Sequence, residues 1–436
     1  MNPRKAVKKL IPRRLFRAIE PYGHLAEAVI FNVLNGFPGR GFKVIGVTGT
    51  NGKTTTSFMI HKMLHEAGYK VGLMSTVGWG AGDDIEMQVH HYTNVPTPEL
   101  MRRLKALRAQ GVEWLVLETT SMALAQHRVY GVPYSVAVLT NLTHEHLGYH
   151  GTFERYRDAK RRMFKLADRN RRGLRTGVIN ADDPNAKYFV GDIKNAVTYG
   201  VKSGDIQAKN IKLSPSGVRY DAVVDGEEYH IQTQVPGSFN VDNSLAAVGV
   251  GRALGLDRQQ IEQGIHALTG VEGRMTRVGE GQDFDAIVDY AHSPDSFEKL
   301  FKDIKPVVKG RLIVVFGSQG GGDRAKRPVQ GELAGKYADE VILCEEDDRS
   351  EDGNKILEEI ASGAIKAGKT RDKDLFLVLD RPSAIRFAVQ ERARAGDTVL
   401  FLGKGHEKTI ERADGEHPWD EIGEVRAALR GLTGRK

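Results

Sequence analysis

Residues 46–56 combine glycines, a lysine and threonines in a spacing suited to binding phosphate groups. The segment reads Gly-Val-Thr-Gly-Thr-Asn-Gly-Lys-Thr-Thr-Thr and follows directly on the apolar run 42–47. Glycines let backbone amides approach phosphate oxygens, and the helix expected to begin here adds the positive end of its dipole. We expect Lys53 to reach the outer phosphates and Thr54 to ligate magnesium. The segment therefore predicts an ATP site.

The loop departs from the most frequent phosphate-binding pattern, which would place a glycine at position 47, where this chain has valine. An incidental glycine-rich turn is the alternative interpretation. The strand before the loop and the helix after it favour a nucleotide site. The residues expected to contact ATP are Gly49, Thr50, Asn51, Gly52, Lys53, Thr54 and Thr55.

Polar side chains also follow the next two apolar runs. Glu118 follows the run 112–117, so it lies at the end of a predicted strand, and we expect it to be a magnesium ligand. The run 134–140 ends in a loop with three histidines, His144, His146 and His150, and no cysteine. A magnesium or substrate role for one of them fits this loop better than a zinc site. For His144 a plain surface histidine is the favoured interpretation.

These loops require a scaffold of alternating strands and helices. Apolar runs at 43–48, 112–118 and 134–140, with helical patterns at 54–67 and 99–110, predict a parallel sheet covered by helices. An antiparallel addition is expected at about 196–235, before a closing helix at 241–254. A second set of strands is predicted at 284–290, 311–316, 340–343, 375–379 and 398–402.

The expected fold class is therefore α/β. We predict a P-loop-type central ATPase domain with a parallel sheet and a smaller C-terminal domain that is Rossmann-like and doubly wound. The expected boundaries are a basic tail and helix at 1–40, with the helical pattern at 22–36, the central ATP-binding domain at 41–270 and the C-terminal domain at 271–436. A chain of 436 residues is long enough for these units.

Composition restricts the compartment and the partners. The single cysteine, Cys344, excludes an internal disulfide framework, and no long uncharged apolar stretch is present, so a cytoplasmic protein is expected. The net charge is +7, and seven lysines and arginines precede the first acid, Glu20. The rest of the chain is therefore neutral overall, which argues against a broad nucleic-acid surface. The sequence indicates no oligomeric state.

The basic tail also contains apolar residues. Val7, Leu10, Ile11, Leu15, Phe16 and Ile19 alternate with the charges and form an imperfect amphipathic helix interrupted at Pro12. Such a segment could rest on an anionic membrane as a peripheral contact. A solvated basic segment followed by a helix packed on the body is at least as well supported.

Residues 49–55, Glu118 and the run 141–150 together resemble the Mur ligase family, the ATP-dependent ligases that add amino acids to the peptidoglycan stem peptide. The resemblance extends from about residue 43 to the C-terminus. Several stretches resemble the member that adds the third residue, diaminopimelate or lysine, to UDP-N-acetylmuramoyl-L-alanyl-D-glutamate.

The resemblance implies roles for further residues of the central domain. The family pattern Glu-Val-Ser-Ser-His-x-Leu-x-Gln-x-Arg corresponds to residues 118–128. It implies that the acceptor nucleotide-peptide is bound by Thr97, Thr120, Gln126 and Arg128. Lys160 matches a lysine that the family carbamylates, and a carbamate could hold a second magnesium ion with His146. From the residues alone, Lys160 would be a lysine on a helix surface.

The C-terminal half carries matching segments as well. The resemblance assigns Asn240, Arg274 and Asp289 to the nucleotide, with a hinge at residues 270–275. It assigns the incoming amino acid to Arg324, Asp347, Arg349, Gly403 and Glu407. The family motif Asp-Asn-Pro-Arg, which selects diaminopimelate, corresponds to Glu346-Asp347-Asp348-Arg349 here. The retained arginine favours diaminopimelate, whereas the added acids could favour a basic side chain.

Two departures from the family bear on the site. Met122 replaces a histidine, and Glu145 and Gly148 replace aspartates, so metal geometry there could be shifted. In addition, about forty residues precede the phosphate loop, where the three-domain ligases carry a UDP-binding domain of roughly a hundred residues. The sequence therefore leaves three options open. The chain could bind the nucleotide end of its acceptor weakly, a partner could provide that binding, or the acceptor could be linked to a lipid.

The leading hypothesis is an ATP-dependent acid–amino-acid ligase that forms ADP and requires ATP and two magnesium ions. Its substrates would be a muramoyl-peptide and an amino acid. A folylpolyglutamate-synthetase-like ligase is the alternative with the same fold. A non-catalytic nucleotide-binding scaffold at the membrane is the alternative from another class, although retention of Lys53, Glu118, His146 and Lys160 argues against it.

Overall fold

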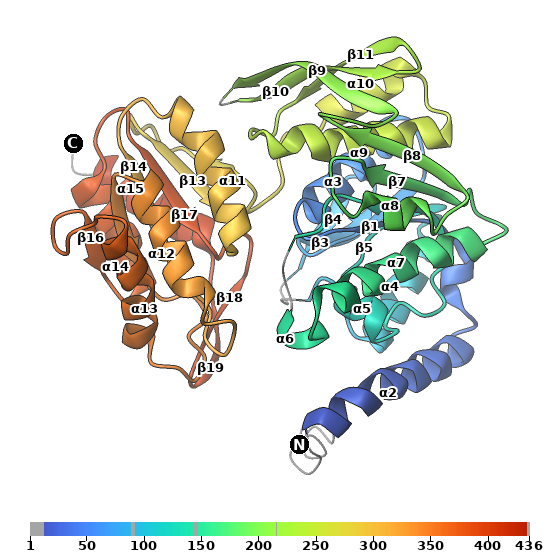
Figure 1. The fold of residues 1–436 in the computed structure, drawn as a ribbon, viewed down its shortest axis with the longest axis horizontal. Coiled ribbons are helices and arrows are strands. Elements are labelled where there is room, and N and C mark those ends of the chain that lie inside the picture. Colours follow the sequence, from blue (N-terminus) through green and yellow to red (C-terminus); the bar gives the residue numbers. More distant parts are fainter. Residues whose placement is uncertain (1–12, 89–91, 144–146, 215, 434–436) are drawn as a thin grey trace.

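The chain folds around two large sheets, each packed against helices, and a separate two-stranded hairpin (Figure 1). The computed structural model describes residues 13–88, 92–143, 147–214 and 216–433. We call the sheet nearer the N-terminus with its helices the central body, and the other sheet with its helices the C-terminal body. Within the described part of the chain, no helix is long and apolar enough to cross a membrane.

The central body is built on an eleven-stranded sheet in the order β11-β10-β9-β8-β7-β6-β1-β5-β2-β3-β4. Strand β1 lies between β5 and β6 and is parallel to both, with Val47 paired with Glu118 on one side and with Val138 on the other. The strands are β1 (Lys43–Thr48), β2 (Val71–Met74), β3 (Gly78–Ala81), β4 (Asp84–Met87), β5 (Trp114–Glu118), β6 (Tyr134–Leu139), β7 (Thr176–Asn180), β8 (Asn195–Gly200), β9 (Ile206–Ser214), β10 (Gly217–Val224) and β11 (Glu227–Thr233).

Helices bury both faces of this sheet. Apolar residues of α3, α9 and α10 form one core with the strands, and residues of α4, α5, α7 and α8 form the other. The helices are α2 (Arg13–Leu34), η1 (Pro38–Gly41), α3 (Lys53–Glu66), α4 (Thr97–Ala109), α5 (Ser121–Ala125), α6 (Leu147–His150), α7 (Phe153–Arg169), α8 (Ala186–Val190), α9 (Phe239–Leu254) and α10 (Arg258–His266). The central parallel strands β1, β2, β5, β6 and β7 are buried along almost their whole length, as expected for a parallel sheet between helices, whereas the antiparallel strands β9, β10 and β11 contain both buried and exposed residues.

The C-terminal body has a six-stranded sheet in the order β12-β13-β17-β14-β15-β16, in which β12 alone is antiparallel to its neighbour. Its elements are β12 (Thr276–Val278), β13 (Asp285–Asp289), α11 (Pro294–Ile304), η2 (Lys305–Val307), β14 (Leu312–Phe316), α12 (Lys326–Tyr337), β15 (Glu340–Leu343), α13 (Gly353–Lys366), β16 (Leu375–Leu377), α14 (Arg381–Arg386), η3 (Phe387–Arg392), β17 (Thr398–Leu402), the hairpin β18 (Thr409–Arg412) with β19 (Gly415–Pro418), and α15 (Glu421–Thr433). The predicted α/β fold class is confirmed.

Three details differ from the sequence predictions. The helix predicted to begin near residue 22 begins at Arg13 and continues through Pro21. Helix α9 does not close the central body, because α10 follows it and packs on α3. The short strands β2, β3 and β4 extend the sheet through a chain segment for which no strand was predicted. Four-residue strands rich in glycine give too little alternation to be recognised.

Candidate active site

The phosphate loop lies between β1 and α3, and two of its glycines are required by close contacts. Gly49 and Gly52 have φ angles of +154° and +81°. A Cβ atom on Gly49 would lie 1.9 Å from the Thr140 hydroxyl oxygen, and one on Gly52 would lie 2.2 Å from Oδ1 of Asn243. No larger residue fits either position without moving the neighbouring β6 loop or α9.

The loop is held by hydrogen bonds to the end of β6. The Asn51 amide donates to Oδ1 of Asn141 at 2.9 Å, and the Thr50 amide donates to its carbonyl at 2.8 Å. The Thr140 hydroxyl donates to the Asn51 carbonyl at 2.6 Å. These contacts fix the backbone in place before any ligand binds, which lowers the entropy cost of binding phosphate.

Two lysine ammonium groups lie on this loop. Nζ of Lys53 donates to the Thr50 carbonyl at 2.8 Å, and Nζ of Lys160 donates to the Gly49 carbonyl at 2.7 Å. Lys160 comes from α7 and is 2% exposed, so it is a buried residue and not the surface lysine that its local sequence suggests. Its Nζ also lies 4.7 Å from the centre of the Tyr156 ring. Positive charge is therefore concentrated where ATP phosphates would lie.

Thr54 and Glu118, each expected to ligate magnesium, lie together beside the loop. The Thr54 hydroxyl donates to Oε2 of Glu118 at 3.1 Å, and the Thr76 amide donates to the same oxygen at 2.9 Å. A hydroxyl and a carboxylate are the oxygen ligands that magnesium prefers, together with phosphate oxygens and water. Within the described ranges, no three His, Cys, Asp or Glu residues gather as a metal site. The pair thus fits a magnesium ion held largely by substrate phosphates.

The other three residues predicted to bind the nucleotide, Asn240, Arg274 and Asp289, lie near the segment that joins the two bodies. The Asp289 carboxylate accepts hydrogen bonds from the amides of Met275 and Ala291, both at 2.8 Å, and burial raises its pKa. The Arg274 guanidinium lies 4.4 Å from the centre of the Tyr290 ring. Asn240 is buried at the start of α9 and donates to the Pro236 carbonyl at 2.7 Å.

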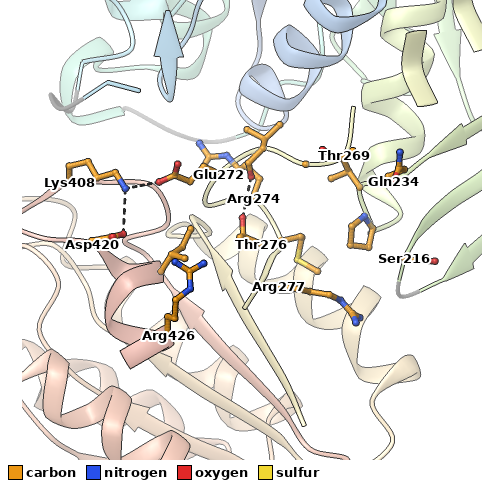
Figure 2. A pocket seen from close by; sticks show the side chains of 16 residues that line it. Ser216, Gln234, Thr269, Glu272, Arg274, Thr276, Arg277, Lys408, Asp420 and Arg426 are labelled. Atoms are coloured by element: carbon orange, nitrogen blue, oxygen red, sulfur yellow. Dashed lines mark hydrogen bonds and ion pairs between the residues drawn. The ribbon is translucent and has the colours of Figure 1, made fainter. Parts of the chain in front are cut away.

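The two bodies also touch at the phosphate loop itself. Nδ2 of Asn51 donates to Oδ2 of Asp295 at 2.7 Å, and Asp295 lies in the first turn of α11. On the hinge, a pocket of about 650 Å³ is lined by residues of both bodies, including Gln234, Arg274 and Arg426 (Figure 2). At this pocket Nζ of Lys408 lies 2.7 Å from Oε1 of Glu272. The structure therefore leaves open space beside a junction with few direct contacts.

A buried charge cluster in the C-terminal body contains several residues predicted to bind the amino acid. Nζ of Lys404 lies 2.8 Å from Oδ1 of Asp347 and 2.6 Å from Oε2 of Glu407. The Tyr290 hydroxyl donates to Glu407 at 3.2 Å. Gly403 has a φ of +100°, and a Cβ atom there would lie 2.7 Å from Oε2 of Glu346. The structure thus brings Asp347, Gly403 and Glu407 together.

Comparison with known proteins places these features in a family. Residues 47–251 match the model described as the Mur ligase middle domain, and residues 273–405 match the Mur ligase, glutamate ligase domain. The chain is 39% identical to a UDP-N-acetylmuramyl-tripeptide synthetase from Roseiflexus sp. (strain RS-1), over 94% of this chain and 83% of that protein. The chain belongs to the Mur ligase family.

Other relatives agree with this assignment. A UDP-N-acetylmuramoyl-L-alanyl-D-glutamate–2,6-diaminopimelate ligase from Geobacillus thermodenitrificans (strain NG80-2) is 38% identical over 94% of this Mur ligase and 84% of that enzyme. A solved diaminopimelate ligase of the same description matches with a TM-score of 0.62 and 31% identity, covering 90% of this chain and 79% of that one. A folylpolyglutamate synthase from Mycobacterium tuberculosis has a TM-score of 0.67 at 16% identity, covering 94% of this chain and 96% of that one, and so shares the fold.

The residues predicted to bind the acceptor lie beside Glu118 in this Mur ligase. The Thr120 hydroxyl accepts from the Ala123 amide, capping α5, and donates to Oδ1 of Asn94 at 2.9 Å. Nη1 of Arg128 donates to the Asn94 carbonyl at 2.7 Å. Thr97 opens α4 and is buried, and its hydroxyl has no hydrogen-bond partner among the residues described. Gln126 is the C-cap of α5, and its side chain forms a hydrogen bond with Tyr149.

Asn94 is a site residue that the sequence prediction missed. Besides its contacts to Thr120 and Arg128, its Nδ2 donates to the Glu118 carbonyl at 2.8 Å. It therefore connects the predicted metal ligand to the predicted acceptor residues. The nearby segment Pro96-Thr97-Pro98-Glu99 was singled out in the sequence, but a lone asparagine two residues earlier carries no local signal.

Two of the remaining predicted residues, Arg349 and Arg324, are paired with carboxylates of the chain. Arg349 donates from Nε to Glu411 at 2.8 Å, and Arg324 pairs with Glu351 at 3.0 Å while its side chain is 57% exposed. Both guanidinium groups thus already face carboxylates of the chain. His144, Glu145 and His146 lie outside the described residues, and the predicted metal role of His146 stays a prediction. His150 is buried, and its Nε2 lies 3.0 Å from the Ser121 hydroxyl.

Proposed function

We propose that this Mur ligase joins diaminopimelate or lysine to the D-glutamyl carboxylate of UDP-N-acetylmuramoyl-L-alanyl-D-glutamate, with ATP converted to ADP and phosphate. The activity belongs to peptidoglycan precursor synthesis. The observation that carries the proposal is the phosphate loop, where Lys53, Lys160 and the Thr54–Glu118 pair surround one backbone segment. The substrate class follows from the names of the relatives at 38–39% identity.

The chemistry divides between the two bodies. An acceptor carboxylate oxygen attacks the γ-phosphorus of ATP, the bond to the β–γ bridging oxygen breaks, and ADP leaves. Lys53 would stabilise the negative charge that spreads over the transferred phosphoryl group. The amino acid's amine then attacks the acyl carbon, loses a proton and expels phosphate. Closure of the bodies would exclude water during this second step.

Thr54 and Glu118 would hold a first magnesium ion, and His146 with a carbamylated Lys160 would hold a second. When bound, the ions neutralise phosphate charge and orient the γ-phosphoryl group. Gly49–Thr55 would bind the phosphates through backbone amides, while Asn240, Arg274 and Asp289 would hold the rest of the nucleotide. We assign residues 41–270 to ATP and the acceptor and residues 271–436 to the amino acid, with Arg274 and Asp289 of the second range also reaching the nucleotide.

The acceptor would lie along Thr97, Thr120, Gln126 and Arg128, which border the Glu118 strand end. The amino acid would lie in the C-terminal body against Asp347, Gly403 and Glu407, with Arg324 and Arg349 at its carboxylates. Both arginines would exchange an internal carboxylate partner for the substrate on binding. A zwitterion needs such a combination of acidic and guanidinium groups.

The test is mass spectrometry of products from ATP, the UDP-linked dipeptide and an equimolar mixture of diaminopimelate and lysine. We expect a tripeptide product with equal amounts of ADP and phosphate from the wild type. Lys53→Ala should form none while remaining folded by circular dichroism. Turnover with tetrahydrofolate and glutamate in place of the muramoyl substrate would instead support the folylpolyglutamate alternative. ATP binding without turnover on either acceptor would support the scaffold alternative.

A further inference from the structure

Helix α2 presents an unbroken apolar face to solvent. The exposed residues between 19 and 34 are Ile19, Tyr22, Gly23, Ala26, Ile30, Val33 and Leu34, and none carries a charge. Tyr22, Val33 and Leu34 are 71%, 60% and 75% exposed. Their spacing of three or four residues places them on one side of the helix. Figure 1 shows α2 as a rod at one edge of the molecule, extending beyond the central body.

The polar residues of this helix are on its other side. His24 and Glu27 form a pair at 3.6 Å with exposures of 16% and 22%. Asn32 is buried and donates to the Tyr130 carbonyl at 3.0 Å, which ties α2 to the central body. A surface helix ordinarily turns its apolar stripe inward and its polar face to water. Helix α2 also buries apolar residues inward, with Ala28 fully buried and Phe31 packed on the core, so apolar side chains lie on both of its sides. The apolar side left in solvent indicates a face that another surface covers.

The charge that precedes this face in the sequence favours one kind of covering surface. Seven lysines and arginines and no acid precede Glu20, and three of them, Arg13, Arg14 and Arg17, lie in the first turns of α2. A second copy of the chain would bring an equally cationic segment to the interface if the helices paired in parallel. An anionic lipid surface matches both features, because it accepts an apolar helix face and attracts adjacent cations.

We propose that the apolar face of α2 docks on an anionic lipid bilayer, and that the lysines and arginines which precede Glu20 in the sequence add electrostatic attraction. The sequence alone predicted a contact through the basic tail, whose residues 1–12 lie outside the described part of the chain. The structure adds the apolar face that such a contact needs. This inference is independent of the ligase activity proposed above.

Docking in this way would also orient the enzyme. Burial lowers the pKa of Arg128, and the nearby Glu20 carboxylate on α2 opposes that shift. Helix α2 thus runs beside the predicted acceptor residues. A bilayer under α2 would therefore lie on the acceptor side of the central body, away from the hinge pocket.

Vesicle co-sedimentation of the full-length protein tests the proposal. We expect the protein to pellet with vesicles of equal parts phosphatidylglycerol and phosphatidylcholine, and at least tenfold less with pure phosphatidylcholine. The double variant Ile30→Ser/Val33→Ser should bind the anionic vesicles at least tenfold more weakly. Its melting temperature and ligase activity in solution should match the wild type, which separates lost docking from misfolding.

The control variant Leu174→Ser/Leu213→Ser removes two apolar side chains of 40% and 46% exposure elsewhere on the surface, and should bind as the wild type does. Absence of pelleting with anionic vesicles overturns the proposal. So does unchanged binding by Ile30→Ser/Val33→Ser. A dimer in light scattering that this variant abolishes, with no vesicle binding by the wild type, would assign the face to a second copy instead.

Discussion

Lys160 shows how a residue's role depends on where the fold places it. Within its helix it has the sequence context of a surface lysine, yet its side chain is buried and its Nζ contacts the phosphate loop at Gly49. A buried ammonium is costly unless its charge is compensated or removed. Carbamylation would convert this cation into an anion suited to magnesium, which is the role proposed above.

Carbamylation can be detected directly by labelling. We expect ¹³C NMR of the protein equilibrated with ¹³C-bicarbonate and magnesium to show a carbamate carbonyl signal that is lost in Lys160→Arg. The guanidinium keeps the charge but forms no carbamate under these conditions. Lys165→Arg, on the exposed side of the same helix, should keep the signal. A signal that persists in Lys160→Arg would show that another lysine reacts.

The positions of Glu346 and Arg349 lead to a prediction about which amino acid the enzyme selects. Oε2 of Glu346 is buried next to Gly403 and has no hydrogen-bond partner among the described residues, so it suits the terminal ammonium that lysine and diaminopimelate share. Only diaminopimelate adds a carboxylate for Arg349. Glu346→Gln should raise KM for both amino acids by about tenfold or more, whereas Arg349→Ala should do so for diaminopimelate alone.

Steady-state kinetics with each amino acid provides the measurement, and the exposed residue change Glu416→Gln is the control. If Arg349→Ala raises KM for lysine by the same factor, Arg349 acts by fixing its own loop through the contact with Glu411 and not by binding the second carboxylate. If the wild type uses only lysine, the acidic residues Glu346, Asp347 and Asp348 select the amino acid, and Arg349 does not.

At the scale of elements, helix α9 carries a carboxyl group whose ionisation opposes folding. Burial raises the pKa of Asp242 to about 6, with the nearby Asp182 adding to the shift. As pH rises, the unfolded chain releases this proton first, so the folded state loses stability between about pH 4 and pH 6. The lost stabilisation amounts to about 3 kcal/mol above that window.

Asp242→Asn removes this penalty and should raise the melting temperature by several degrees at pH 7.5, with little change at pH 4. Thermal melts at the two pH values provide the measurement. Asp84→Asn, at an exposed position on β4, should show no such difference. An equal gain for Asp242→Asn at both pH values would mean that the amide acts by packing or hydrogen bonding and not by removing a charge.

The elements that local sequence determines were predicted well. The phosphate loop, β1 and α3 follow from glycine spacing and an apolar run, and the two residues expected to ligate magnesium, Thr54 and Glu118, lie within hydrogen-bond distance of each other. Strands β2 to β4 were missed because each is only four residues long, too short for its pattern to be recognised. Asn94 was missed for a related reason: its three partners come from distant positions, and nothing in its own neighbourhood indicates them.

At the scale of the whole molecule, catalysis requires the two bodies to meet in one geometry. The hinge residue Gly273 has a φ of +70°, and a Cβ atom there would lie 2.2 Å from the His406 amide nitrogen. Gly273→Ala should therefore displace the loop with Gly403 and Glu407 relative to the hinge. We expect kcat to fall by about tenfold or more, with ATP affinity nearly unchanged, because misplacing one reactant slows reaction without removing the nucleotide site.

Rates and ATP affinities of two variants test this expectation. Gly281→Ala is the matched control, because Gly281 also has a positive φ of +88° but open space around its Cβ position. It should keep kcat within about threefold, since backbone strain alone acts on stability. A wild-type rate in Gly273→Ala would mean that the hinge adapts and does not set the geometry.

The central claim is that an acceptor carboxylate of a muramoyl-dipeptide becomes an acyl phosphate and then an amide. It is tested most directly with acceptor labelled with ¹⁸O in the D-glutamyl side-chain carboxylate, incubated with ATP and the preferred amino acid. We predict that each product molecule formed transfers a single ¹⁸O atom to inorganic phosphate, as seen by mass spectrometry. Product formation with unlabelled phosphate, or no tripeptide from either amino acid, would contradict the account.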